Sequence, residues 1–231
     1  MPKEVSFGPC TFAWLENKYG RFLSLNGQIH HEQYENIAYQ PYIPMLLDTK
    51  EYDLFVDCGA YIGAFTMAGA FNCKKVISYE ASPFLFGILL FNTRHKFNVD
   101  CRYAWIGKEG QIPMAKEEEI GMVTANRSSK YNIPVAELDS LLEIVKSHPK
   151  TLIKIDIEGN ELNALEKATE LLKRTYIHWV IDCHHQHSIS VEDVLKFFPN
   201  RDVYNASNVL VVKGGLADPN DPMFKGWKRL G

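Results

Sequence analysis

From residue 53 onward, short apolar runs alternate with longer segments in which apolar residues recur at helical spacing. The short runs predict buried β-strands, because a strand covered on both faces shows a continuous hydrophobic run. Five such strands are predicted, at residues 54–57, 75–79, 99–105, 152–155 and 177–182. The intervening segments predict helices at residues 62–71, 83–95, 138–147, 160–174 and 191–198.

Strands that alternate with helices predict a mostly parallel sheet with right-handed crossover connections and helices on both faces. Residues 202–204 and 209–213 lie on either side of a polar turn and predict a closing hairpin, which adds an antiparallel strand. Residues 107–134 are polar and predict an irregular segment. The predicted fold class is therefore α/β, a Rossmann-like three-layer sandwich.

The first 50 residues have a different texture, because they are rich in aromatic and amide side chains and poor in periodicity. They predict a hairpin followed by a helix that leads into the main domain. We expect residues 1–50 to form an N-terminal extension that serves as a lid or contacts the substrate. The cofactor-binding domain then spans residues 51–215, and a C-terminal tail spans residues 216–231.

Composition narrows the classes of protein to which the chain can belong. Its 231 residues are 46% hydrophobic and 23% charged, which suits one globular domain with an extension. The net charge of −3 supplies no global basic field, so nucleic acid is a conceivable partner but not the favoured one. The five cysteines are odd in number and lack C-x-x-C spacing, which argues against a disulfide framework or a zinc ribbon.

The sequence predicts neither a signal peptide nor a membrane span. The N-terminus lacks the apolar core of a signal peptide, and no apolar run reaches the ~18–20 residues of a transmembrane helix. We therefore expect a cytoplasmic protein without a membrane partner.

The residues that end the predicted strands are the first candidates for function, because open α/β sheets bind ligands beyond the carboxyl ends of their strands. Acidic and other polar groups recur at these positions. They are Asp57, Glu80, Trp105, Asp156 with Glu158, and His184 with His185. A polar residue at a single strand end often just begins a loop, but the whole set is harder to explain in that way.

Residues 55–66 combine a strand that ends in Asp57 with the start of a helix. Two glycines, Gly59 and Gly63, lie between them. A dinucleotide site has the motif G-x-G-x-x-G, whose second glycine lets the backbone approach a pyrophosphate; the corresponding position here is Tyr61. Asp57 would repel a pyrophosphate but attract the ammonium group of S-adenosyl-L-methionine, so the stretch favours S-adenosyl-L-methionine as the cofactor.

Glu80 ends the next predicted strand. Its distance from Asp57 is near the roughly 20-residue spacing at which an acidic side chain accepts hydrogen bonds from both ribose hydroxyls. The spacing therefore supports a cofactor that contains adenosine.

Residues 152–161 form the second candidate region, with Asp156 and Glu158 two positions apart after an apolar strand. The two carboxylates share one face if the strand continues through them, and Gly159 permits a sharp turn into the following helix. They could bind the substrate, orient the cofactor's ammonium group or act as a base. The helix dipole alone favours acidic residues at a helix start, but it does not explain Asp156 on the strand side.

Histidines follow the fifth predicted strand, at His184 and His185, whereas His178 lies within that strand. A histidine titrates near neutral pH and therefore suits a general base for a substrate hydroxyl. A metal site with an oxygen from Asp156 is the competing interpretation, but adjacent histidine side chains point apart in an extended chain. We expect His184 to be the base and expect no metal.

Three blocks of the sequence match motifs of one known family. Residues 56–63 (VDCGAYIG) match V-D-x-G-A-N-x-G, and residues 79–83 (YEASP) with Asn92 match E-P-x-P followed by L-x-x-N. Residues 138–141 (LDSL) and 153–161 (IKIDIEGNE) match the most specific block, L-D-S-L followed by I-K-I-D-V-E-G-x-E. With these blocks the chain resembles the FkbM family of S-adenosylmethionine-dependent methyltransferases, over most of its length.

The resemblance implies a class I methyltransferase sheet and transfer of a methyl group to a hydroxyl oxygen. It makes Asp156 and Glu158 the crevice carboxylates. Two positions depart from the family motifs, because the asparagine of the first is Tyr61 here and the proline of the second is Ala81. The expected cofactor-binding residues are Asp57, Gly59, Ala60, Tyr61, Gly63, Glu80, Ala81, Trp105 and Asp156, and the expected catalytic residues are His184, Glu158 and Asp156.

The expected function is methyl transfer from S-adenosyl-L-methionine to a hydroxyl oxygen of a small molecule or sugar, with His184 or Glu158 taking the hydroxyl proton. Two alternatives stay open: an RNA methyltransferase that acts on a ribose or a cap, and a non-catalytic protein that retains the fold. A homodimer is expected because dimers are common among soluble enzymes.

Overall fold

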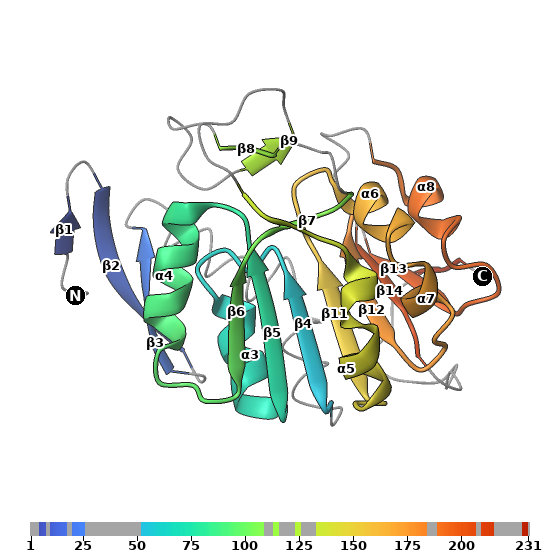
Figure 1. Cartoon of the computed structure of the whole chain (residues 1–231), viewed down its shortest axis with the longest axis horizontal. Coiled ribbons are helices and arrows are strands. Elements are labelled where there is room, and N and C mark those ends of the chain that lie inside the picture. Colours follow the sequence, from blue (N-terminus) through green and yellow to red (C-terminus); the bar gives the residue numbers. More distant parts are fainter. Residues whose placement is uncertain are drawn as a thin grey trace.

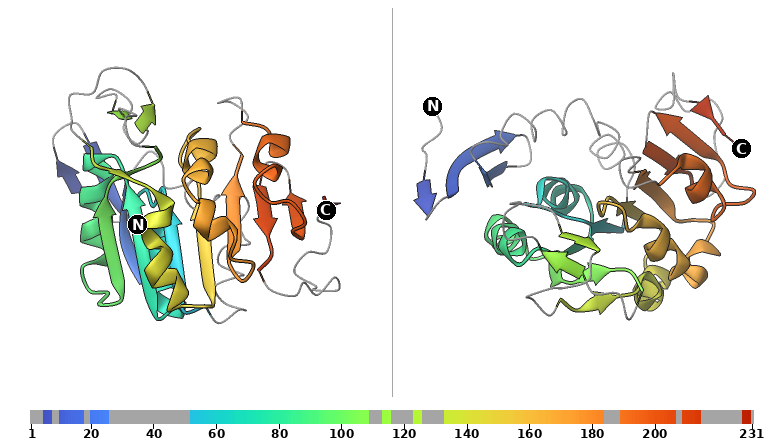
Figure 2. Two further views of the ribbon diagram at one scale, coloured as in Figure 1. Left: turned by 45° about the vertical axis from the view of Figure 1, so that its right-hand side comes forward. Right: turned by 90° about the horizontal axis from the view of Figure 1, so that it is seen from above.

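A central eight-stranded sheet with helices on both faces dominates the computed structural model of the chain (Figures 1 and 2). This is the three-layer α/β arrangement that the sequence predicts, which is thereby confirmed. The structure describes residues 5–7, 10–17, 20–25, 52–108, 113–115, 123–125, 133–183, 189–206, 209–214 and 228–230.

Five neighbouring parallel strands correspond to the five apolar runs of the sequence. In order across the sheet they are β6 (Val99–Tyr103), β5 (Lys75–Glu80), β4 (Leu54–Cys58), β11 (Thr151–Ile155) and β12 (His178–Asp182). The strand order reverses between β4 and β11, because the chain moves outward from β4 to β6 and then returns to the other side of β4. Such a reversal is where open α/β sheets bind their ligands.

The predicted closing hairpin is confirmed as β13 (Val203–Ala206) and β14 (Val209–Val212), and β14 pairs with β12 in the antiparallel direction. A further short strand, β15 (Lys228–Arg229), pairs with β13. These antiparallel strands therefore lie beside β12, away from the reversal between β4 and β11.

Helices cover the two faces of the sheet as the right-handed crossovers require. One face carries α3 (Ala64–Asn72) and α4 (Pro83–Thr93), which contact each other. The other face carries η3 (Leu138–Leu141), α5 (Leu142–Lys146), α6 (Glu161–Glu166), α7 (Thr169–Leu172) and α8 (Val191–Leu195).

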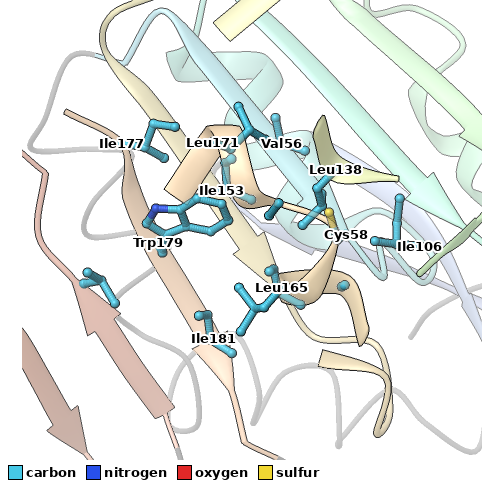
Figure 3. Close-up of a cluster of buried hydrophobic side chains, with 14 of the residues drawn as sticks. Val56, Cys58, Ile106, Leu138, Ile153, Leu165, Leu171, Ile177, Trp179 and Ile181 are labelled. Carbon is cyan, nitrogen blue, oxygen red and sulfur yellow. The ribbon is translucent and has the colours of Figure 1, made fainter. Parts of the chain in front are cut away.

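Alternate residues of the central strands supply two separate cores. Val56 of β4 packs with Ile153 of β11, Leu165 and Trp179 in the larger core, beneath the helices that follow η3 (Figure 3). Phe55, the neighbour of Val56, belongs instead to the core beneath α3. Burial on both faces explains why these strands show continuous apolar runs in the sequence.

The predicted helix at residues 160–174 is wrong in one respect, because it is divided into α6 and α7. Asp139, in the LDSL block, causes the division: its carboxylate accepts the backbone N–H groups of Glu170 (2.9 Å) and Leu171 (3.0 Å). It also accepts the hydroxyl of Thr169 at 3.0 Å. A carboxylate from another segment thus caps the N-terminus of α7, where a continuous helix would have no free N–H groups.

The predicted strand at residues 99–105 also divides. β6 ends at Tyr103, and β7 (Trp105–Ile106) pairs instead with β10 (Val135–Ala136) in a separate parallel pair. The segment at residues 107–134, predicted to be irregular, contains a small antiparallel pair, β8 (Pro113–Ala115) and β9 (Val123–Ala125).

The N-terminal segment contains a three-stranded antiparallel sheet, β1 (Val5–Phe7), β2 (Cys10–Asn17) and β3 (Gly20–Leu25), which includes more than the predicted hairpin. The buried amide of Asn92 on α4 holds β3 in place. It accepts the N–H of Leu23 at 2.7 Å and donates to the carbonyls of Leu23 (3.0 Å) and Ile62 (2.8 Å). The helix predicted after this hairpin lies outside the described residues.

None of the helices in the described part of the chain has both the length and the apolar character that crossing a bilayer requires.

Candidate active site

Two turns meet at the reversal of strand order, one after β4 and one after β11. We call residues 59–63 the first turn and residues 156–160 the second turn. Gly59 lies where they touch, with a φ of +78°. A Cβ on Gly59 would lie 1.8 Å from the carbonyl oxygen of Asp156, so only glycine allows the two turns to approach so closely.

Four backbone N–H groups of the first turn donate to oxygens of the protein. The N–H groups of Gly59 and Ala60 both donate to the carbonyl of Tyr79, at 3.0 and 2.9 Å. The N–H of Tyr61 donates to the Glu80 carboxylate at 2.8 Å, and that of Gly63 donates to the carbonyl of Ala60 at 2.8 Å. These four groups are therefore committed to protein oxygens and form no cradle for a phosphate, which would need N–H groups that point outward.

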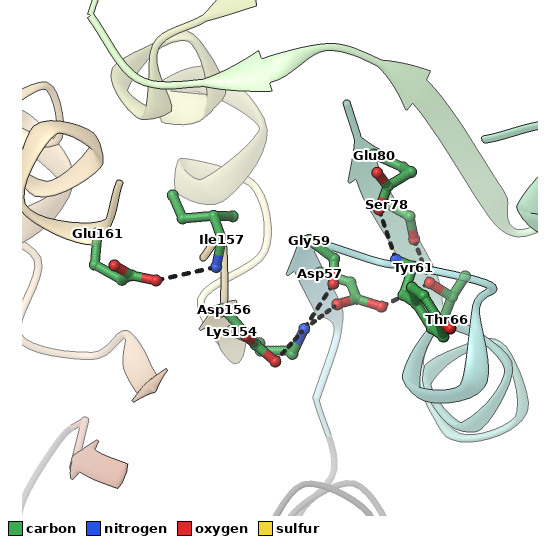
Figure 4. Close-up of polar contacts among 10 residues, drawn as sticks. All are labelled: Asp57, Gly59, Tyr61, Thr66, Ser78, Glu80, Lys154, Asp156, Ile157 and Glu161. Atoms are coloured by element: carbon green, nitrogen blue, oxygen red, sulfur yellow. Dashed lines mark hydrogen bonds and ion pairs between the residues drawn. The ribbon is translucent and has the colours of Figure 1, made fainter. Parts of the chain in front are cut away.

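Glu80 at the end of β5 supports the first turn with its side chain (Figure 4). One carboxylate oxygen accepts the N–H of Tyr61, and the other accepts the N–H of Ser82 at 2.7 Å. Burial raises the pKa of Glu80 to about 7, although hydrogen bonds from the backbone of Ser82, Tyr61 and Ala81 oppose the rise. The Glu80 carboxyl group therefore titrates near neutral pH.

A buried lysine joins the two turns. The Nζ of Lys154 donates to the carbonyl of Gly59 at 2.8 Å and forms ion pairs with Asp57 (3.3 Å) and Asp156 (3.4 Å) (Figure 4). Burial by itself lowers the pKa of Lys154, but the charges of Asp156 and Asp57 raise it overall, so the ammonium form is maintained. Its single positive charge thus holds carboxylates from both strands.

Asp57 is completely buried and its side chain contacts protein groups on both oxygens. Beside the ion pair with Lys154, it accepts the hydroxyl of Thr66 at 2.6 Å. The hydroxyl of Ser78 lies 2.8 Å from that of Thr66; because Thr66 donates its one proton to Asp57, Ser78 is the donor to Thr66. Asp57, expected as a cofactor contact, thus anchors α3 and Lys154 to the end of β4.

The second turn contains two residues of positive φ, Glu158 (+53°) and Gly159 (+96°). The buried carboxylate of Glu161 accepts the N–H of Ile157 at 3.1 Å (Figure 4) and that of Gly159 at 3.3 Å. These bonds fix the turn at the start of α6. Asn160 donates its side-chain amide to the carbonyl of Ile106 at 2.6 Å. Asp156 and Glu158 are therefore carried on a rigid turn beside the first one.

The other predicted cofactor residues lie around these turns. Ala60 is buried, and Gly63 has a φ of +94° and begins α3. Ala81 and Trp105 pack in one small apolar cluster with Ile133, so the structure brings these two predicted residues together. The indole Nε1 of Trp105 is buried and has no hydrogen-bond acceptor among the described residues.

The predicted base, His184, and its neighbour His185 lie outside the described residues. The residue just before them, Cys183, is described, and burial together with nearby acidic groups raises the pKa of its thiol to about 12. Cys183 is therefore protonated and is no nucleophile at neutral pH. His178 lies at the opposite end of β12, where its ring accepts or donates a 2.6 Å hydrogen bond with the Tyr52 hydroxyl.

A family model described as "Methyltransferase FkbM domain" matches residues 57–204, from the end of β4 to β13. The chain belongs to the FkbM methyltransferase family. Membership confirms the resemblance seen in the sequence and, since the family is S-adenosylmethionine-dependent, the predicted cofactor. Among curated proteins, none matches the chain.

The chain of this FkbM methyltransferase was also compared with solved structures. A methyltransferase FkbM from Methylobacillus flagellatus KT superposes with a TM-score of 0.50 at 19% identity, covering 70% of this chain and 44% of that one. The chain thus spans less than half of that relative. The N-methyltransferase NodS from Bradyrhizobium japonicum WM9, in complex with S-adenosyl-L-homocysteine, has a TM-score of 0.48 at 13% identity, covering 78% and 85%. The expected class I methyltransferase fold is confirmed.

Three residues of this FkbM site were not predicted as functional, namely Lys154, Thr66 and Glu161. Lys154 had a visible signal, because a lysine inside an apolar strand that is buried on both faces must find an opposite charge. Glu161 follows the second turn closely in sequence, and a carboxylate there can accept the N–H groups of that turn. Thr66 gave no such signal, because a threonine within an apolar helix is common.

Proposed function

We propose that this protein transfers a methyl group from S-adenosyl-L-methionine to a hydroxyl oxygen of a small molecule or sugar. The choice of cofactor rests on one observation about the first turn. Its N–H groups at Gly59, Ala60, Tyr61 and Gly63 all bond to protein oxygens. These four N–H groups are therefore not free to bind the phosphates of a nucleoside diphosphate. The carboxylates around this turn are acceptors instead. They match a cofactor that offers hydrogen-bond donors and a positive charge in place of phosphate.

The residues around the turns fit such a cofactor by their chemistry. The Glu80 carboxylate accepts the backbone N–H groups of Tyr61, Ser82 and Ala81 and retains a further lone pair, with which it can accept a ribose hydroxyl. Asp156 is partly exposed, so its carboxylate can meet an ammonium group while Lys154 holds it from behind. The apolar pair Ala81 and Trp105 suits a flat adenine ring.

When bound, S-adenosyl-L-methionine supplies a methyl group that its sulfonium charge activates. The protein's own task is to hold the acceptor oxygen in line with that methyl group and to exclude water. Two groups are candidates to take the hydroxyl proton, the imidazole of His184, which follows β12 in the sequence, and the carboxylate of Glu158. Lys154 and Asp57 act indirectly, because they fix the two turns relative to each other.

Calorimetry with S-adenosyl-L-methionine and with ADP tests the cofactor part. We expect binding of S-adenosyl-L-methionine and much weaker binding of ADP, which has the same adenosine but carries phosphates. Glu80→Gln should weaken the binding of S-adenosyl-L-methionine about 10- to 100-fold, because a ribose hydroxyl loses a charged acceptor. Glu143→Gln, on the exposed side of α5, is the matched control and should change nothing. Equal affinity for ADP would contradict the proposal.

The acceptor part needs a separate measurement. Methyl-labelled cofactor is incubated with hydroxyl-bearing small molecules and sugars, with amines, and with RNA. Label on a hydroxyl oxygen of a small acceptor supports the proposal, whereas label only on RNA or on nitrogen overturns this part and leaves the cofactor part intact. His184→Ala and Glu158→Gln are then compared; the base is the one whose loss lowers turnover without weakening cofactor binding.

A further inference from the structure

Exposed apolar side chains are concentrated in one part of the described molecule. The large apolar residues with the most exposed side chains all lie between residues 71 and 97. They are Phe71, Phe84, Leu90, Phe91 and Phe97, with exposed fractions from 41% to 104%. Single exposed apolar residues are ordinary, but a cluster of this size marks an interaction surface.

Helix α4 carries three of these residues and contains no charged side chain from Pro83 to Thr93. Its outward face presents Phe84, Leu90 and Phe91 at helical spacing. Gly87 lies on the same face, and a Cβ added there would meet no atom within 4 Å. A surface helix normally shows polar residues to water, so the outward face of α4 departs from the usual pattern.

The end of α4 is basic. Residues 81–99 contain no acidic residue, although the whole chain has a net charge of −3. The Arg94 guanidinium lies over the Phe91 ring at 4.0 Å, and the Lys96 ammonium lies 5.9 Å from the centre of the Phe71 ring. Positive charge and exposed aromatic rings are therefore combined on one surface, which α3 and α4 share because they lie side by side (Figure 2).

We propose that α4 and the loop at residues 94–97 bind the surface of a membrane that contains anionic lipids. Phenylalanine rings would enter the boundary between headgroups and acyl chains, as in other helices that lie in the interface. Arg94 and Lys96 would reach lipid phosphates with their charged ends while their stems cover apolar surface. Phe97, which is fully exposed at the loop, would insert most deeply.

The charge pattern favours a membrane over two other occupants. A second copy of the chain, related by a twofold axis, would bring this basic surface against itself. A nucleic acid would match the charge and could stack on the phenylalanine rings, but the aliphatic side chain of Leu90 and the bare Gly87 offer it neither hydrogen bonds nor stacking. Because α4 starts at the carboxyl end of β5, residues 94–97 also lie at the amino ends of the strands, away from the candidate active site (Figure 1).

The sequence predicts no membrane partner, a prediction that rests on the lack of a spanning segment. Peripheral binding needs no such segment. Only the structure shows that one apolar face of α4 is buried and that another is exposed to solvent.

Vesicle flotation of the full chain tests the proposal. Vesicles of phosphatidylcholine alone are compared with vesicles that contain about one-third phosphatidylserine. We expect binding to the anionic vesicles only, weakened by salt. Arg94→Ala with Lys96→Ala should weaken binding about 25-fold, since each basic group near the surface contributes about fivefold. Phe97→Ser should weaken it about tenfold or more through lost apolar burial.

The matched control is Lys173→Ala with Lys196→Ala, which removes the same charge from exposed positions on the other face. It should float with anionic vesicles as the unchanged protein does. If this control loses as much vesicle binding as Arg94→Ala with Lys96→Ala, binding depends only on net charge and the proposal is wrong. Absence of binding by the unchanged protein, dimerisation that Phe97→Ser abolishes, or binding to single-stranded RNA that displaces the vesicles would also overturn it.

Discussion

Both turns of the candidate site are stabilised by a buried glutamate, but the two glutamates come from different parts of the chain. Each contains residues of positive φ and is held by a buried glutamate. Glu161 accepts two N–H groups of the second turn, whereas Glu80 accepts one N–H of the first turn and that of Ser82. Glu161 belongs to the helix that its own turn begins. Glu80 comes from the neighbouring strand and joins the first turn to Ser82, at the start of α4.

The origin of each glutamate shows how far the shape of its turn depends on the rest of the sheet. The second turn can take its shape from a few consecutive residues, because its acceptor is local. The first turn keeps its shape only while β5 lies beside β4. Lys154 connects the two turns. It therefore aligns the second turn with the first, whose shape depends on the sheet.

Removal of the connection between the turns should have the largest effect. Lys154→Met leaves the buried carboxylate of Asp57 without its counter-charge and should lower the free energy of unfolding by about 3–5 kcal/mol. Chemical denaturation measures this value. Adding Asp57→Asn should restore part of the loss, because the two residues are coupled. A loss that is simply the sum of both changes would show that the pair is not a unit.

The pH response should distinguish the first turn from the second. The pKa of Glu80 in the folded protein, about 7, exceeds its ordinary value of 4.5. The folded state therefore binds the proton more tightly, and Glu80 adds stability that is complete below pH 4.5 and is lost as pH rises through about 7. The change is on the order of 3 kcal/mol.

Unfolding experiments at several pH values across this window measure the effect. Glu80→Gln should remove the dependence, whereas Glu143→Gln, on the exposed surface of α5, should retain it. If cofactor binding requires ionised Glu80, affinity for S-adenosyl-L-methionine should also fall by about tenfold per unit as pH decreases below 7. Identical pH profiles for the unchanged protein and Glu80→Gln would refute the assignment.

A single methyl group added where the two turns approach each other should lower the stability of the folded protein. Gly59→Ala should cost about 2–3 kcal/mol, because its Cβ meets the carbonyl of Asp156 and because its φ is positive. Gly87→Ala on α4 is the matched control; it has open space and should stabilise the helix by about 0.5–1 kcal/mol. Thermal unfolding of both variants checks the contrast, and a neutral Gly59→Ala would mean that the turns separate easily.

The local turn should give the smallest effect. Glu161→Ala removes the acceptor of two N–H groups and should cost about 1.5–2 kcal/mol, whereas Glu161→Gln keeps an oxygen acceptor and should cost less than half of that. Denaturant titration compares the two. Equal losses would indicate that the charge of Glu161, and not its hydrogen bonds, stabilises the turn.

Much of the fold could be predicted from the sequence. The apolar runs located the five parallel strands of the central sheet, and the polar turn after Tyr204 located the closing hairpin, because burial on both faces and turn chemistry are local properties. The helix at residues 160–174 was predicted without its interruption, since the cause lies in Asp139, a distant residue. Trp105 was placed in β6 because nothing local reveals that it pairs with β10.

The sequence by itself determined the alternation of strands and helices, the family motifs and the acidic groups at the strand ends. Only the tertiary structure decided what those groups do: Asp57 is buried against Lys154, and Glu80 accepts the N–H of Tyr61 in the first turn. The physical reason is distance along the chain. Residue type and spacing specify local conformation and burial, whereas ion pairs and shared hydrogen bonds depend on strands that become neighbours only after folding.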